Sequence, residues 1–162
     1  MAARVCILVA VALPLTAADL ATKALLPTYP GLYHDRSNAW ALASIALLAL
    51  AIALCRLPSR LLAAAAGVFA AGLAGNLVSA LDHRGGVPNP FVAGTVAFNL
   101  ADVLFVAGVA LVGAAGMRVA RRHRHLLPTA SIPVRIARYV RLRREARLER
   151  AEPPLLPHTR QP

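Results

Sequence analysis

Acidic residues are scarce in this chain, which has seven Asp and Glu residues against 18 Lys and Arg residues and a formal net charge of +11. Such a basic balance often indicates a protein that binds nucleic acid. Twelve of the 18 basic residues, however, lie after residue 117. The charge is therefore a property of a C-terminal tail, and we expect no nucleic-acid partner.

Cysteine is scarcer still. Cys6 and Cys55 both fall within apolar segments, and their spacing matches no metal-binding motif. Two thiols cannot build a disulfide framework of any size. We interpret both as small buried hydrophobic residues, and we expect neither a metal nor a cofactor.

Long apolar segments are what the chain does have, since 58% of its residues are hydrophobic and its mean hydropathy is +0.60. Four segments are long enough for a bilayer, at about residues 5–26, 39–55, 61–81 and 96–117. The sequence predicts an all-α integral membrane bundle of four transmembrane helices over residues 1–117.

Basic residues in the short connections set the predicted orientation. Arg4 precedes the first segment, Arg56 and Arg60 join the second to the third, and the Arg cluster follows the fourth. The positive-inside rule then places both termini in the cytoplasm. We expect the basic cytoplasmic tail, residues 118–162, to be partly helical or disordered. Residues 134–152 are predicted to form either a basic helix on the anionic lipids of the inner leaflet or part of a disordered end.

Polar residues inside the apolar segments gather at one predicted level, just within the outer membrane boundary. They are Asp19, Lys23, Asn76, Asn99 and Asp102, with Asn38 at the start of the second segment and Asp82 in the loop joining the last two. Ionisable groups inside a membrane are costly unless paired or hydrated, so they indicate a functional site. The alternative is a structural clamp in which Asp19 pairs with Lys23 and the amides bridge helices.

Four short motifs resemble those of signal peptidase II, the membrane aspartic endopeptidase family that trims prolipoproteins. They are "DLATK" (19–23), "SNAW" (37–40), "AGLAGNL" (71–77) and "FNLAD" (98–102). Their order and their places on the predicted topology agree with the family, and the resemblance covers about residues 5–117. The chain is therefore interpreted as a divergent member.

The resemblance implies a multi-pass protein of the bacterial plasma membrane with its active face outward. It also implies an endopeptidase that cleaves the signal peptides of lipid-modified prolipoproteins. The family's chemistry uses two carboxylates that share a proton, one as general base and one as acid. By resemblance Asp102 is one of the pair. Residues that shape the site or bind the substrate are Asp19, Lys23, Asn38, Asn76 and Asn99.

The second carboxylate is where the chain departs from the family. The family carries it in the loop between the last two spans, where this chain reads "GGVPNPF" (85–91) and places Asn89 at the catalytic position. An amide cannot act as a general base. Asp82 is the one acid left in this loop. It is either the alternative partner for Asp102 or, within "DHR" (82–84), a shifted form of the family's Asp-Arg pair with a structural role. The outer loop 27–37 is also short, with little room for strands.

Two functions stay open on these residues. The chain is either an active endopeptidase that uses Asp102 and Asp82, or a catalytically impaired paralogue that binds lipoprotein or lipid without cutting. A third reading, a small transporter with a proton-relay Asp, needs a polar path through the bilayer. The inner halves of all four segments are apolar, which argues against it.

Overall fold

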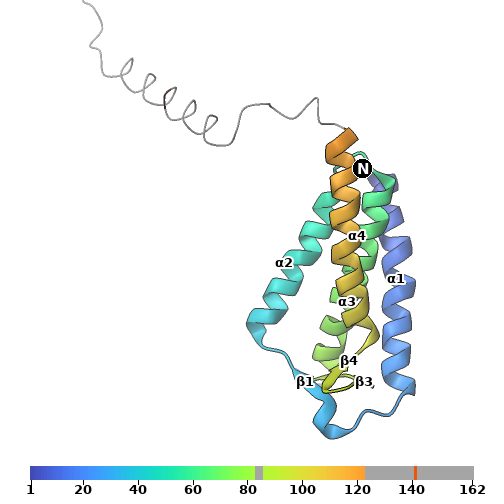
Figure 1. Ribbon diagram of the computed structural model, residues 1–162, viewed down its shortest axis with the longest axis vertical. Helices are drawn as coiled ribbons and strands as arrows, with labels where there is room; N and C mark the ends of the chain where they lie inside the picture. Colours follow the sequence, from blue (N-terminus) through green and yellow to red (C-terminus); the bar gives the residue numbers. More distant parts are fainter. Residues whose placement is uncertain (83–85, 123–140, 142–162) are drawn as a thin grey trace, which may run out of the picture. The chain divides into compact units, whose positions relative to one another are not determined.

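Four helices make up most of the computed structural model, which describes residues 1–82, 86–122 and 141. They are α1 (Ala2–Leu25), α2 (Asn38–Leu54), α3 (Arg60–Asp82) and α4 (Leu100–Arg122), and they alternate in direction (Figure 1). Helices α1, α3 and α4 are each long and apolar enough to cross a membrane, whereas α2 has 17 residues. Three of the four predicted spans thus meet the length of a membrane helix.

Helix α3 lies at the centre and packs against each of the other three helices. Most of its buried positions are Ala or Gly, and such small residues let helix backbones approach closely. The closest approach is to α4. A Cβ atom at Gly72 would meet the backbone of Ala101 and Phe105, and one at Gly108 would meet Phe69.

The fourth helix begins later than the sequence predicted. Residues Val96–Phe98 form strand β4, which pairs antiparallel with β3 (Phe91–Ala93), and α4 starts at Leu100. Asn99 sets this start because its side-chain oxygen accepts from the backbone N–H of Asp102 at 3.0 Å. The predicted start at residue 96 is wrong, and the helix continues past residue 117 to Arg122.

The short outer loop does contain a strand, contrary to expectation. After a 3-10 turn, η1 (Pro30–Leu32), strand β1 (Tyr33–Asp35) pairs antiparallel with β2 (Gly86–Pro88). The pair ties the α1–α2 connection to the α3–α4 connection, so the fold is helical with two small strand pairs. Three-residue strands give no periodic signal in a sequence, which is why the all-α prediction missed them. We call this end of the molecule the strand end.

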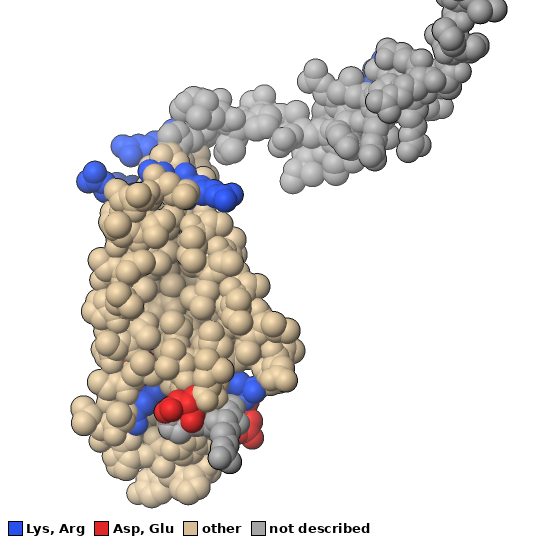
Figure 2. Space-filling view, turned by 180° about the vertical axis from the view of Figure 1, so that it is seen from behind, with Lys and Arg blue, Asp and Glu red and all other residues tan. Residues whose placement is uncertain are grey.

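Charged residues divide between the two ends of the bundle (Figure 2). The end opposite the strands, here called the arginine end, carries Arg4, Arg56, Arg60, Arg118, Arg121 and Arg122. There the guanidinium of Arg4 donates to the carbonyl of Cys55 at 2.7 Å. The acidic residues of the described chain all lie toward the strand end. Asp82 ends α3 and Asp102 lies in the first turn of α4, while Asp19 of α1 and Asp35 of β1 are near the same end.

Two predictions concern residues away from this polar end. Cys55 is buried as predicted, but Cys6 is exposed, because it lies on a face of α1 that no other described element covers. The predicted basic helix over residues 134–152 lies outside the described residues apart from Arg141.

Candidate functional site

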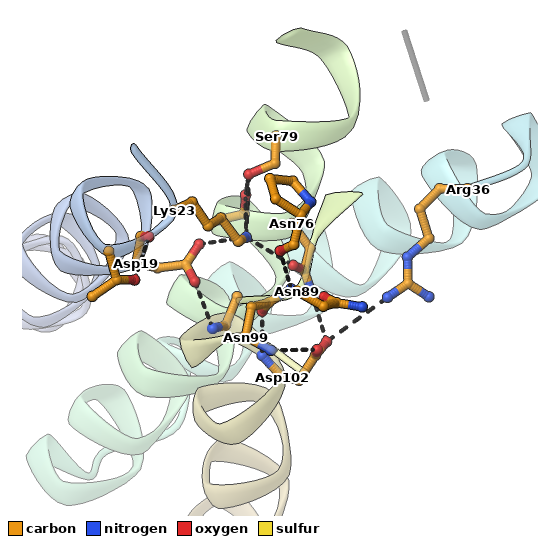
Figure 3. Close-up of polar contacts among 12 residues, drawn as sticks. Asp19, Lys23, Arg36, Asn76, Ser79, Asn89, Asn99 and Asp102 are labelled. Carbon is orange, nitrogen blue, oxygen red and sulfur yellow. Dashed lines mark hydrogen bonds and ion pairs between the residues drawn. The ribbon is translucent and has the colours of Figure 1, made fainter. Parts of the chain in front are cut away.

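Polar side chains from α1, α3 and α4 meet at the strand end (Figure 3). The structure brings together five of the residues singled out in the sequence, namely Asp19, Lys23, Asn76, Asn99 and Asp102. Asp19 and Asn99 are fully buried. Asp102 keeps a third of its side chain exposed, so it is the member of this group that a ligand can reach most easily.

The Lys23 ammonium lies in a cage of acceptors. Its Nζ donates to Asp19 Oδ2 at 2.7 Å, to Asn76 Oδ1 at 3.0 Å and to Ser79 Oγ at 3.1 Å. The carbonyl of Gly75 is a fourth acceptor at 3.4 Å, so acceptors are present for all three ammonium hydrogens. Lys23 is therefore fully occupied inside the protein, which is the geometry of a structural clamp.

The second oxygen of Asp19 reaches another helix. Its Oδ1 accepts from the backbone N–H of Ala101, in the first turn of α4, at 2.7 Å. The first amides of a helix have no partner within it, and their dipoles favour a negative charge. Gly75 makes room for this contact, since a Cβ atom there would strike the Asp19 carboxylate. Asp19 thus joins α1 to the start of α4.

Asn99 and Asp102 form a reciprocal cap at the start of α4. The Asn99 side chain accepts from the Asp102 N–H, and Asp102 Oδ2 accepts from the Asn99 N–H at 3.1 Å. This is a capping box with Asn and Asp in place of the usual residues. The other Asp102 oxygen, Oδ1, accepts from Asn76 Nδ2 at 2.8 Å. The cap fixes the Asp102 carboxylate in one orientation.

The Asp102 carboxylate borders a cavity of about 360 Å3 between α2, α3 and α4. Most of its wall is apolar, with Ala43, Leu47, Leu73 and Phe105 among the lining residues. Its polar lining residues are Arg36, Ser44, Asn76 and Asp102. A mainly apolar cavity with a few fixed polar groups is the usual form of a small-ligand site.

Arg36 is a site residue that sequence reasoning missed. Its guanidinium lies 3.8 Å from Asp102 Oδ1 and 4.9 Å from the centre of the Trp40 ring. Arg36 and Trp40 also line a second cavity of about 310 Å3 on the other side of the start of α2. In the sequence Arg36 is simply a basic residue before an apolar segment, so no pattern could have indicated the contact with Asp102.

The two candidates for a second acid lie in different surroundings. Asn89 is only 3% exposed, and its side-chain oxygen accepts from Asn99 Nδ2 at 2.7 Å. Asn89 is therefore one hydrogen bond from the residue that caps Asp102. Asp82, the last residue of α3, is exposed. The Asn89 amide thus lies within the buried network, and the Asp82 carboxylate lies on the surface.

Asn38 lies apart from the polar cluster. It is the exposed first residue of α2, and Ser37 before it caps the helix by accepting from the Trp40 N–H at 3.2 Å. Asn38 lines the second cavity and not the one that Asp102 borders. No group of His, Cys, Asp and Glu able to hold a metal ion occurs among residues 1–82, 86–122 and 141.

Comparison with known proteins returns no relative: no family model, no curated protein and no solved structure matches this chain. The distinguishing features of the site are therefore Asp102 and Arg36 at the cavity and the buried Asn89 that contacts Asn99.

Proposed function

We propose that this chain is a signal peptidase II-like membrane protein that binds the lipid-modified segment of a prolipoprotein and does not cut it. One observation carries the proposal. Asp102 is the one acidic residue of the described chain that lines the cavity. Asn89, which by resemblance stands where the family carries its second acid, is a buried amide bonded to Asn99.

Hydrolysis of a peptide by this type of site needs two carboxyl groups. One takes a proton from water, and the other gives a proton to the scissile carbonyl. The amide of Asn89 has no proton that it can exchange in this way. Asp102 is moreover engaged by Asn76, by the Asn99 backbone and by Arg36. These contacts suit a carboxylate that orients a ligand.

The cavity suits a lipid-bearing ligand. Its apolar side chains, such as Leu47, Leu73 and Phe105, match acyl chains, and Asp102 and Arg36 stand at the strand end to meet a polar backbone. The cavity lies between helices of a membrane protein, so acyl chains can enter from the bilayer. This division into an apolar body and a polar end is what a diacylglyceryl-modified cysteine in a peptide presents.

The direction of the helices supports four crossings in the proposed membrane. Helices α1 and α3 both run from the arginine end to the strand end, so the chain has to return between them, and α2 makes that return. Arg4 at the start of α1 contacts Cys55 at the end of α2. With the arginine end in the cytoplasm, the site faces outward from the bacterial plasma membrane and both ends of the bundle's chain lie inside.

The proposal is tested in bacteria depleted of their own signal peptidase II and supplied with the tagged full chain. We expect a model prolipoprotein to stay uncut on a gel and to co-purify with the chain. Ala43→Phe fills the cavity and should reduce co-purification several-fold. Ala46→Phe is the matched control, because Ala46 is an exposed residue of the same helix that does not line the cavity.

Two further variants separate binding from catalysis. We expect Asn89→Asp to restore some cutting, because it returns a carboxyl group to the network beside Asp102. If the unmodified chain shortens the precursor, and both Asp102→Asn and Asp82→Asn stop it, the chain is an active endopeptidase and the proposal is wrong. A precursor that is neither cut nor retained also contradicts it.

A further inference from the structure

A third cavity lies toward the arginine end of the bundle, away from the proposed ligand site. It is a groove of about 400 Å3 between α1 and α4, and its floor is the first half of α3. Ala64 and Val68 of α3, Leu111 and Ala114 of α4 and Val11 of α1 are among its lining residues.

The groove is apolar along its length and basic at one end. Arg118 is the one charged residue that lines it. Within residues 1–82, 86–122 and 141, Arg118 makes no hydrogen bond and no ion pair. Contact between water and such an apolar wall is unfavourable. The groove therefore suits a hydrocarbon chain whose polar end contacts the Arg118 guanidinium.

The surroundings of Arg118 carry charge of one sign. Arg60 begins α3 and Arg121 and Arg122 end α4, all at the arginine end. No acidic residue of the described chain lies at this end, since the four described acids lie toward the strand end. A counter-charge has to come from outside this part of the protein. In the proposed orientation, the anionic headgroups of the inner leaflet supply this negative charge at the level of Arg118.

We propose that this groove is a binding site for one anionic phospholipid. An acyl chain lies in the groove against Ala114 and Val68, and the headgroup phosphate pairs with Arg118. Arginine is well suited to this pairing because its planar donors match two phosphate oxygens. The site is separate from any contact of the C-terminal tail with the leaflet and does not depend on the function of Asp102.

The test compares two phospholipids that share their acyl chains and differ in headgroup charge. Dissociation constants of dioleoyl phosphatidylglycerol and dioleoyl phosphatidylcholine are measured by native mass spectrometry on the full chain in detergent. We expect phosphatidylglycerol to bind more tightly. Arg118→Gln should weaken its binding about fivefold, the effect of one basic residue at an anionic surface.

Two controls separate the groove from general surface charge. Arg122→Gln makes the same change of charge on the same helix, but Arg122 does not line the groove, so we expect affinity to be unchanged. Ala114→Phe fills the groove with the charge intact and should weaken the binding of both lipids. Ala114→Leu, a smaller change, gives the same test if the Phe variant does not fold.

Three results would overturn the site. Equal losses in Arg118→Gln and Arg122→Gln would show diffuse attraction between the arginine end and the lipid. Equal binding of phosphatidylcholine would show that headgroup charge is not recognised. Unchanged binding of phosphatidylglycerol by Ala114→Phe and Ala114→Leu would show that the acyl chain does not lie in the groove.

Discussion

Asp19 is the residue on which most of the polar cluster depends. One of its oxygens binds Lys23 and the other binds the backbone of α4, while its side chain is fully buried. A buried ion pair is stable only when hydrogen bonds satisfy its remaining oxygens and protons. Asp19 meets this condition with partners from α1 and α4, and Lys23 meets it with acceptors that include Asn76 of α3.

We predict that Asp19→Asn destabilises the protein strongly. The substitution leaves the Lys23 ammonium buried without its counter-charge, and breaking a buried pair in this way costs about 3–5 kcal/mol. The free energy of unfolding of the detergent-solubilised chain measures the effect. Asp35→Asn, which changes an exposed carboxylate of β1, should stay within about 0.5 kcal/mol of the unmodified chain.

A second substitution identifies the cause of the loss. If the unpaired ammonium is responsible, Asp19→Asn combined with Lys23→Met should recover part of the stability. Equal losses in Asp19→Asn and Asp35→Asn would mean that the cluster contributes little to the fold.

The sequence indicates some of these contacts and conceals others. The four-residue spacing of Asp19 and Lys23 places them on one helix face, so their pairing was predictable. The spacing of Asn99 and Asp102 is a helix-start signal, but the apolar residues 96–98 before it favoured an earlier start. The contact between Arg36 and Asp102 depends on how the loop before α2 folds back, which no local pattern records.

At the scale of the elements, the close packing of α3 against α4 positions Asn76 and Asp102, which come from these two helices. Gly108 faces the backbone of Phe69, whereas Gly113 has nothing within 4 Å of the position a Cβ would take. The two glycines lie on the same helix and differ in what they face. They therefore separate the effect of helix packing from the effect of helix propensity.

We predict that Gly108→Ala lowers the free energy of unfolding by about 1–3 kcal/mol, the usual cost of overpacking. Gly113→Ala should cause no loss, because its methyl group meets no neighbour and Ala favours a helix. Chemical unfolding in detergent measures both variants. If Gly108→Ala is as stable as Gly113→Ala, the helices separate easily and the close contact is not needed.

Helices were the most predictable elements, and the strands were not. Apolar length alone places α1, α2 and α3 within a few residues of their observed bounds, because a membrane helix needs an uninterrupted apolar stretch. Strands β1 and β2 are three residues each and depend on pairing across 53 positions of sequence. Such short strands are stabilised by their partner and by the helices beneath them, and their own residues give no alternating pattern.

At the scale of the whole molecule, the distribution of charge sets the proposed orientation. The arginine end has no described acid, and the strand end holds all four described acids. Helix α2 is about 26 Å long from its 17 residues, a little less than the roughly 30 Å of a bilayer core. In the proposed topology, the residues on either side of α2, including Arg36 and Arg56, therefore lie near the two membrane surfaces.

The proposed four crossings make the connections on either side of α2 accessible from opposite sides. In a chain with Cys6→Ser and Cys55→Ser, we expect Tyr29→Cys to react with an impermeant maleimide on intact cells. Pro58→Cys, in the connection from α2 to α3, should react only after the membrane is opened. Both positions are exposed in the protein, so burial does not hide either one.

Labelling of Tyr29→Cys and Pro58→Cys from the same side would contradict this topology. It would mean that α2 does not cross and that α1 and α3 run in opposite senses through the membrane.

The hydrogen bond between Asp19 and Ala101 joins positions 82 residues apart, which has a consequence for how the protein is made. A ribosome adding about 5–20 residues per second needs roughly 4 to 16 seconds to reach the second position after the first. In the proposed membrane topology, the four-residue pair with Lys23 neutralises the carboxylate during that interval, so α1 can enter the bilayer early. Asp19 Oδ1 has no partner until α4 brings the Ala101 N–H to it. Until α3 and α4 follow, the nascent chain also lacks two acceptors of Lys23, Asn76 and Ser79.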